Sequence, residues 1–296
     1  TSIGPHWERA PKDLKNDIDR VFCSGVNRIV WHTFTSSPAE FGLPGNEYFA
    51  GTHLNPNTTW WEMAGSFIDY INRCSYMLQQ GLFVGDVLYY YGDDVPNFVF
   101  IKEEAKDLPA GYDWDKCSGS VILNRISISG NKIILPDGMS YRLLVLPDEK
   151  SIDIKVLRKI QNLVNEGMIL IGPPPEKPSG LSGYPRSDEE LKTIVRRLWG
   201  KIDGNTVTEN RFGKGKVIWG KSLAEVLIEM NVPPDFYFTG STGETSLDFI
   251  HRSTQNQEIY FVLNRFEYKG VNDFNYRYNP ELPDRYEEVE CYFRVK

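Results

Sequence analysis

The hydrophobic pattern of the first ninety or so residues switches between helical and strand periods. Apolar residues recur at helical spacing between Pro11 and Gly25, which predicts a helix that ends at the glycine. Residues 26–34 form a short run of β-branched and aromatic residues, which predicts a buried strand. The pattern predicts a long amphipathic helix over residues 60–80 and a strand over residues 82–91. A helix followed at once by a buried strand is typical of a parallel α/β sheet.

The middle of the chain carries the strongest pattern. A strand is predicted over residues 141–147, an amphipathic helix over residues 154–166 and a second apolar strand over residues 168–172, which together form a βαβ unit. Residues 127–135 suggest a hairpin that turns at Gly130-Asn131. Further elements are predicted as a helix over 188–199, a strand over 216–219 and a helix over 222–230. These elements predict an open, mostly parallel α/β domain.

The pattern becomes β-rich after Pro233-Pro234. Residues 246–252 and 258–264 alternate between apolar and polar positions, and we expect them to pair as strands. A third strand is predicted over residues 287–295. We therefore divide the chain into residues 1–95, an α/β domain over 96–240 and the start of a β-sandwich over 241–296.

Composition excludes several classes of function. The net charge of −7 argues against nucleic acid as a partner, because a phosphate-binding surface is basic. No run approaches the ~18 apolar residues of a membrane span. Four widely spaced cysteines without a CxxC motif indicate neither a zinc site nor a disulfide framework. The 16 tyrosines, 16 phenylalanines and 7 tryptophans fit either sugar-stacking sites or a large core. Both ends of the sequence look cut, so the lack of a signal peptide indicates no compartment.

The α/β domain lacks the motifs of a nucleotide-binding fold. Its first strand-to-helix turn, residues 147–150, is acidic and contains no glycine, whereas a dinucleotide site needs a glycine-rich turn. The Gly213-Lys214-Gly215-Lys216 stretch does not have P-loop spacing. An amidotransferase-type site would need a Cys or Ser elbow, but residues 168–172 run into three prolines. We expect no nucleotide cofactor and interpret this domain as structural.

The end of the strand predicted over residues 26–34 is the better candidate site. His32 lies at that end and a long loop rich in proline and glycine follows, which is where a (β/α)8 barrel places functional side chains. The alternative is a buried histidine whose bonds are satisfied by the backbone. His53 and Asn55 in the loop are weaker candidates. Of Trp60 and Trp61, we expect one ring in the core and the other facing the loop.

Carboxylates matter because glycosidic cleavage usually needs two of them. The acidic residues near this loop are Glu8, Glu40, Glu47 and Glu62. Their spacing singles out none of them, and most glutamates on a protein surface are simply solvated.

Several longer runs occur in a specific order. Between Thr1 and Asp94 the chain contains TSIGPHWERAP, DLKNDIDRVFCSGVNRIVWHTFTSSP, LPGN, GTHLNPNTTWW and INRCSYMLQQGLFVGDVLYYYGDD. Later it contains YRLLVLP, GMILIGPPPEKPSGLSGYP, LWG, FGKGKVIWG, PPDF, FIHR and IYFVLN. Over nearly its whole length the chain resembles an internal part of glycoside hydrolase family 106, the α-L-rhamnosidases.

The resemblance implies a fold and an activity. Residues 1–95 would be the end of the catalytic (β/α)8 barrel, followed by a flavodoxin-like, amidotransferase-like but non-catalytic domain. The whole protein would be a large, multidomain bacterial enzyme of the periplasm or cell exterior. It would remove terminal α-L-rhamnose from plant-type polysaccharides by inverting, calcium-assisted hydrolysis. The alternative from another class is a non-catalytic carbohydrate-binding or scaffold relative.

The resemblance transfers no catalytic residue to this chain. In the family the catalytic carboxylates precede the segment that resembles Thr1-Ser2, so we expect them upstream of Thr1. Only positions on the rim of the barrel transfer as substrate-binding candidates: His32, His53, Trp60 and Trp61. The resemblance assigns no calcium ligand, and we expect the 296-residue chain alone to be inactive.

Overall fold

The structure of the chain is a computed structural model. The described residues are 7, 9–49, 53–97, 102, 105, 107–240, 245–265 and 286–295. The chain forms two compact units, each built from two segments. Unit 1 consists of Thr1–Gly81 and Phe238–Cys291, and unit 2 consists of Leu82–Tyr237 and Tyr292–Lys296.

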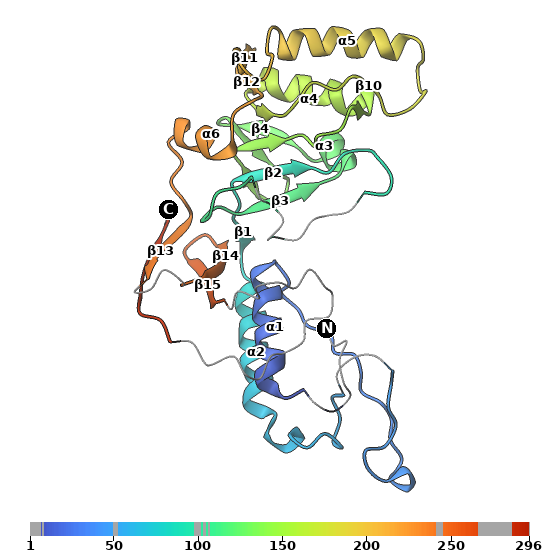
Figure 1. Ribbon diagram of the computed structural model, residues 1–296, viewed down its shortest axis with the longest axis vertical. Helices are drawn as coiled ribbons and strands as arrows, with labels where there is room; N and C mark the ends of the chain where they lie inside the picture. The colour runs from blue at the N-terminus through green and yellow to red at the C-terminus, as the bar shows by residue number, and fades with distance from the viewer. Residues whose placement is uncertain are drawn as a thin grey trace. The chain divides into compact units, whose positions relative to one another are not determined.

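Unit 2 is built around a six-stranded sheet (Figure 1). In spatial order its strands are β11 (Glu209–Phe212), β12 (Gly215–Ile218), β9 (Ile169–Ile171), β7 (Leu143–Val145), β2 (Val87–Tyr90) and β3 (Trp114–Cys117). Five strands are mutually parallel, and only the edge strand β11 is antiparallel to its neighbour. Numbered along the chain, the five parallel strands lie in the order 2-1-3-4-5, with the order reversing between β2 and β7.

The predicted βαβ unit is confirmed. Strands β7 and β9 flank α4 (Ile154–Glu166) and pair in parallel. The helix begins where the Asp153 carboxylate accepts the Lys155 amide at 2.6 Å, and it ends at Gly167 with φ of +134°. Helices α3 (Gly119–Asn124), α5 (Arg186–Trp199) and α6 (Leu223–Glu229) complete the unit. The structure thus contains the parallel α/β arrangement that the hydrophobic pattern predicted.

The sheet buries both faces because alternate residues point to opposite sides. Leu144 and Leu170 pack with α4 and α5 in one apolar cluster, whereas Leu143 and Ile171 pack with α6 in another. Trp199, at the end of α5, is buried and donates its indole N–H to the Gly172 carbonyl at 3.0 Å. Burial on both faces explains why these strands read as continuous apolar runs.

Local turn chemistry forms the hairpin of β4 (Ser127–Ser129) and β5 (Lys132–Ile134). Gly130 and Asn131 both have positive φ, 56° and 61°, as a two-residue type I′ turn requires. The predicted hairpin is therefore confirmed, and β6 (Ser140–Tyr141) adds a third strand to it.

The strand predicted over residues 82–91 lies in unit 2, where it is divided into β1 (Leu82–Phe83) and β2. Strand β2 pairs with β3 and β7 in the centre of the parallel sheet. The compact unit begins at Leu82. Sequence reasoning also missed β3, whose WDKC sequence is too polar to show an apolar run.

The described part of unit 1 contains two α-helices and a hairpin. Helix α1 (Pro11–Cys23) packs against β14 (Leu247–Ser253) and β15 (Glu258–Asn264), where the rings of Phe22 and Phe261 meet at 5.8 Å. The two strands are antiparallel, as predicted, with His251 opposite Tyr260. Helix α2 (Gly65–Leu78) lies against α1. The Tyr70 hydroxyl of α2 donates a hydrogen bond to the buried Asp19 carboxylate of α1 at 2.7 Å. The predicted helix over residues 60–80 is shorter, because a 3-10 turn, η2 (Trp61–Met63), precedes α2.

The strand predicted over residues 26–34 is not assigned as a strand within the described part of the chain. The segment is nevertheless extended, and exposure alternates from residue to residue between 26 and 35. Val30 is 85% exposed, and Phe34 is 65% exposed. A strand is defined by its hydrogen-bonded neighbour, and the described residues give this segment no ladder. The apolar run was correctly identified, but the expected burial was wrong.

The remaining elements are short. They are η1 (Ala39–Phe41), β1 (Leu82–Phe83), β8 (Ser151–Ile152), β10 (Lys177–Pro178), β13 (Phe236–Gly240) and β16 (Val289–Phe293). Strands β8 and β10 pair in parallel, and β13 pairs with β16. Among the described residues, no helix combines the length and apolarity needed to cross a bilayer.

Candidate rim of a carbohydrate site

The extended segment that carries His32 forms one side of the candidate site. The His32 ring is exposed and meets the Tyr48 ring edge to face, with 4.8 Å between the ring centroids. Because exposure alternates along this segment, His32 shares its exposed side with Val30 and Phe34. His32 is therefore not the buried, backbone-satisfied histidine of the alternative interpretation.

The loop after this segment folds back along it. The Leu54 amide donates to the Thr33 carbonyl at 3.2 Å, and the Asn55 side-chain amide donates to the Thr35 hydroxyl at 3.2 Å. Asn55 is 1% exposed, so it fixes the loop and is not a solvated loop residue. Residues twenty positions apart in the sequence are thereby held side by side.

His53 lies inside this fold-back and is only 4% exposed. Its ring stacks on Trp7, with centroids 4.0 Å apart and 13° between the planes. The Trp7 indole N–H donates to the Glu47 carboxylate. Tyr48, the next residue, touches His32, so one chain of contacts connects His53 to His32. Sequence reasoning did not select Trp7, because no local pattern distinguishes a single tryptophan.

The two adjacent tryptophans have different environments. Trp60 is 8% exposed and donates its indole N–H to the Arg9 carbonyl at 3.0 Å, which makes it part of the core. Trp61 is half-buried and meets the exposed Phe34 ring at 6.3 Å. One ring of the pair, Trp60, therefore belongs to the core, and the other, Trp61, lies next to the exposed segment.

We call the residues Trp7, His32, Tyr48, His53 and Trp61 the aromatic rim. Flat rings of this kind can pack against the C–H face of a sugar, while imidazole nitrogens and a carboxylate bond its hydroxyls. Of the carboxylates considered above, Glu47 accepts the Trp7 indole N–H. Glu47 is exposed, as are Glu40 and Glu62, and Glu8 lies outside the described residues. The rim thus contains the kinds of group that sugar sites use, but its described residues do not present the two facing carboxylates of a glycosidase.

The described part of the chain was also searched for clusters of metal-ligating side chains. Within the described ranges, no three His, Cys, Asp or Glu side chains gather in a way that could hold an ion.

In unit 2 the point where the strand order reverses carries a carboxylate of the protein itself. Doubly wound sheets bind ligands between the loops at this point. Here the Glu149 carboxylate lies against Gly92, only 2.2 Å from where a Cβ would be, and accepts the Asp93 amide at 3.2 Å. Burial, with the nearby Asp94 and Asp93 carboxylates, raises the pKa of Glu149. The Glu149 carboxylate thus occupies the Asp93 backbone amide that a bound phosphate would need as a hydrogen-bond donor.

Comparison with known proteins gives consistent results. The family model for glycoside hydrolase family 106, described as alpha-L-rhamnosidase, matches residues 1–289. A rhamnosidase structure from Novosphingobium sp. PP1Y superposes with a TM-score of 0.78 and 30% identity, covering 98% of this chain and 26% of that one. A Formosa agariphila protein, provisionally named a beta-glucuronidase, is 36% identical over 264 residues, which are 89% of this chain and 21% of the relative.

The chain thus spans about a fifth to a quarter of the length of the proteins it matches. The family match extends through both compact units, so it does not rest on one motif. The order of runs noted in the sequence and the superposition of the fold agree with it. The chain belongs to glycoside hydrolase family 106, the α-L-rhamnosidases.

Proposed function

We propose that the whole protein removes terminal α-L-rhamnose from plant-type polysaccharides by inverting, calcium-assisted hydrolysis. The chain supplies part of the catalytic domain and the aromatic rim that contacts the sugar. The catalytic carboxylates lie upstream of Thr1, and the calcium ligands are not assigned to particular residues. The protein acts in the bacterial periplasm or outside the cell, where such polysaccharides are found.

The observation that carries the proposal is the stacked pair of Trp7 and His53. His53 is only 4% exposed and stacks on the Trp7 indole, which is itself hydrogen-bonded to Glu47. These contacts fix the orientation of the histidine ring. Fixed aromatic and polar groups are what a sugar site needs, because they lose little freedom when the ligand binds. Family membership supplies the substrate class, and the rim supplies residues that can recognise it.

Unit 2 serves a structural role in this proposal. Its strand order of 2-1-3-4-5 is that of flavodoxin-like sheets, which supports a flavodoxin-like, non-catalytic domain. The Glu149 contact with Gly92 and Asp93 supports the same role. The extended segment of residues 26–35 contributes to the final part of a (β/α)8 barrel.

The test uses the full-length protein and an aryl α-L-rhamnoside. We expect His53→Ala to lower kcat/KM by about tenfold or more, because a buried ring that positions the sugar is lost. Trp60→Phe is the control: it removes the Arg9 hydrogen bond and lowers stability by about 1 kcal/mol without changing KM. Unchanged kcat/KM in His53→Ala would remove His53 from the site.

Two further measurements separate the proposal from its alternative. A chelator should abolish turnover, and full activity in chelator would contradict calcium assistance. Sugar binding without turnover by the full-length protein would instead indicate the carbohydrate-binding or scaffold relative. The 296-residue chain alone should hydrolyse no rhamnoside, and turnover by this chain would contradict the placement of the carboxylates upstream.

A further inference from the structure

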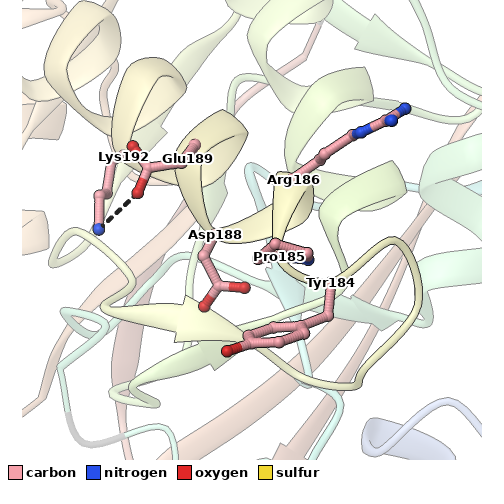
Figure 2. Close-up of a pocket in the computed structure, with 6 residues that line it drawn as sticks. All are labelled: Tyr184, Pro185, Arg186, Asp188, Glu189 and Lys192. Carbon is pink, nitrogen blue, oxygen red and sulfur yellow. Dashed lines mark hydrogen bonds and ion pairs between the residues drawn. The ribbon is translucent and has the colours of Figure 1, made fainter.

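The surface of unit 2 has a hollow where the chain enters α5 (Figure 2). Its volume is about 460 Å³, within the range of small-molecule sites. The lining residues come from the last turn before the helix and from its first two turns: Tyr184, Pro185, Arg186, Asp188, Glu189 and Lys192. None of these residues belongs to the aromatic rim.

The backbone that forms this hollow is firmly held. The Ser187 amide donates to the Gly183 carbonyl at 3.1 Å, and the Tyr184 amide donates to the Leu181 carbonyl at 3.1 Å. Helix α5 is anchored by its buried face, which includes Leu191 and Ile194 in the main apolar cluster of unit 2. The hollow is therefore preorganised, and a ligand would not have to order a loop.

Three lining side chains offer groups that the protein itself does not use. The Tyr184 side chain is largely exposed, and the Asp188 carboxylate lines the same hollow (Figure 2). In the described part of the chain, Asp188 and Arg186 form no side-chain hydrogen bond or ion pair. Glu189 differs, because it pairs with Lys192 at 2.9 Å. The hollow thus presents an aromatic ring, a carboxylate and a guanidinium; the last two form no hydrogen bond with another described side chain, although the Asp188 charge acts on Lys192 electrostatically.

These groups select the chemical class of ligand. The lining carries two cations and two carboxylates, so it attracts neither a phosphate nor an amine strongly. An aromatic ring packs on C–H groups, a carboxylate accepts from hydroxyls and a guanidinium donates to them. A neutral pyranose has both a C–H face and hydroxyls around its edge, and it matches all three.

We propose that the hollow around Tyr184 and Asp188 binds a neutral glycosyl unit of a polysaccharide. The inference rests on the carbohydrate chemistry of the family and on the lining residues, and it does not depend on the linkage that the enzyme cleaves. The site gives unit 2 a role in holding the polymer while its non-reducing ends are processed. It is a second place on this chain where a polysaccharide binds.

The experiment is affinity electrophoresis of the full-length protein through gels that contain a neutral galactan or a neutral glucan. Neither polymer carries terminal rhamnose, so retardation does not report on the cleaved sugar. We expect Tyr184→Ala and Asp188→Asn each to weaken the apparent affinity by about tenfold, because each removes a main contact of the sugar. Tyr76→Ala is the matched control, since Tyr76 is 66% exposed and Tyr184 is 67% exposed.

The outcomes are separable. Loss of retardation in Tyr184→Ala or Asp188→Asn, with Tyr76→Ala unchanged, supports the site. No retardation of the native protein by either neutral polymer overturns it, as does equal retardation of all the variants. Retardation only by a polyuronate overturns the neutral class of ligand. Hydrolysis of an aryl α-L-rhamnoside is measured in parallel, so that failure of the proposed activity is not confused with failure of this site.

Discussion

Arg294 belongs to the second segment of unit 2 and forms a buried ion network with residues of the first segment. Its guanidinium donates to both Asp86 carboxylate oxygens at 2.9 and 3.0 Å, and to the Pro233 carbonyl at 2.7 Å. It also lies 3.3 Å from Asp235. The Asp86 and Asp235 side chains are 3% and 1% exposed, so both carboxylates depend on partners within the protein.

Replacement of Arg294 by Met keeps the aliphatic part of the side chain and removes the charge. Loss of one partner of a buried ion pair costs about 3–5 kcal/mol. We expect the low end of that range, about 3 kcal/mol, because Arg142 still contacts Asp86 at 2.7 Å. That free energy corresponds to about a hundredfold increase in the opening equilibrium of the network.

The assay is hydrogen–deuterium exchange of the full-length protein, read in peptides that cover β2. Arg158→Met is the matched control, because Arg158 also makes two bonds of 2.8 Å to one carboxylate, that of Glu190. That pair is 50% and 36% exposed, and a surface pair contributes about 0–1 kcal/mol. If Arg294→Met speeds exchange in β2 no more than Arg158→Met does, burial does not determine the strength of this network.

Two further predictions concern the core of unit 2. Gly215→Ala should lower the free energy of unfolding, measured by urea denaturation, by about 2–4 kcal/mol, because the added Cβ would lie 2.2 Å from the Met168 carbonyl oxygen. Gly180→Ala is the control: Gly180 has open space around it, so the free energy of unfolding should change by less than about 0.5 kcal/mol. Equal effects would mean that the backbone shifts freely around β12. Burial raises the pKa of Cys117 from 9.0 to about 12, so at pH 9 only about one thiol in a thousand is ionised in the folded state. The unfolded thiol ionises near 9, so this group lowers stability as pH rises from 9 to 12, and rapid alkylation of native Cys117 at pH 9 would contradict its burial.

The sequence by itself determined the elements whose signals are local. Helix α4 has an apolar face of 3.6-residue period, a capping aspartate at residue 153 and a glycine at its end, and its predicted limits are those observed. The turn at Gly130-Asn131 fixed the β4–β5 hairpin, because both residues tolerate positive φ. The family could also be identified from the sequence, since its runs keep their order along the chain.

The tertiary structure decided which strands share a sheet. Strand β2 pairs with β7 some fifty residues later, and no local pattern records that choice. The polar edge strand β3 became visible only through its pairing with β2. Conversely, residues 26–34 have the apolar pattern of a strand, but a strand needs a hydrogen-bonded neighbour that the pattern cannot supply.

The sequence also determined only part of the candidate site, and the tertiary structure decided the rest. The sequence selected His32 at a predicted strand end and His53 in the loop that follows, whereas Trp7 was found only by its stacking on His53. The sequence could not tell which of Trp60 and Trp61 enters the core, because the hydrogen bond to the Arg9 carbonyl joins positions 51 residues apart. Periodicity and turn residues specify local conformation, but contacts between distant segments depend on packing that only the folded chain provides.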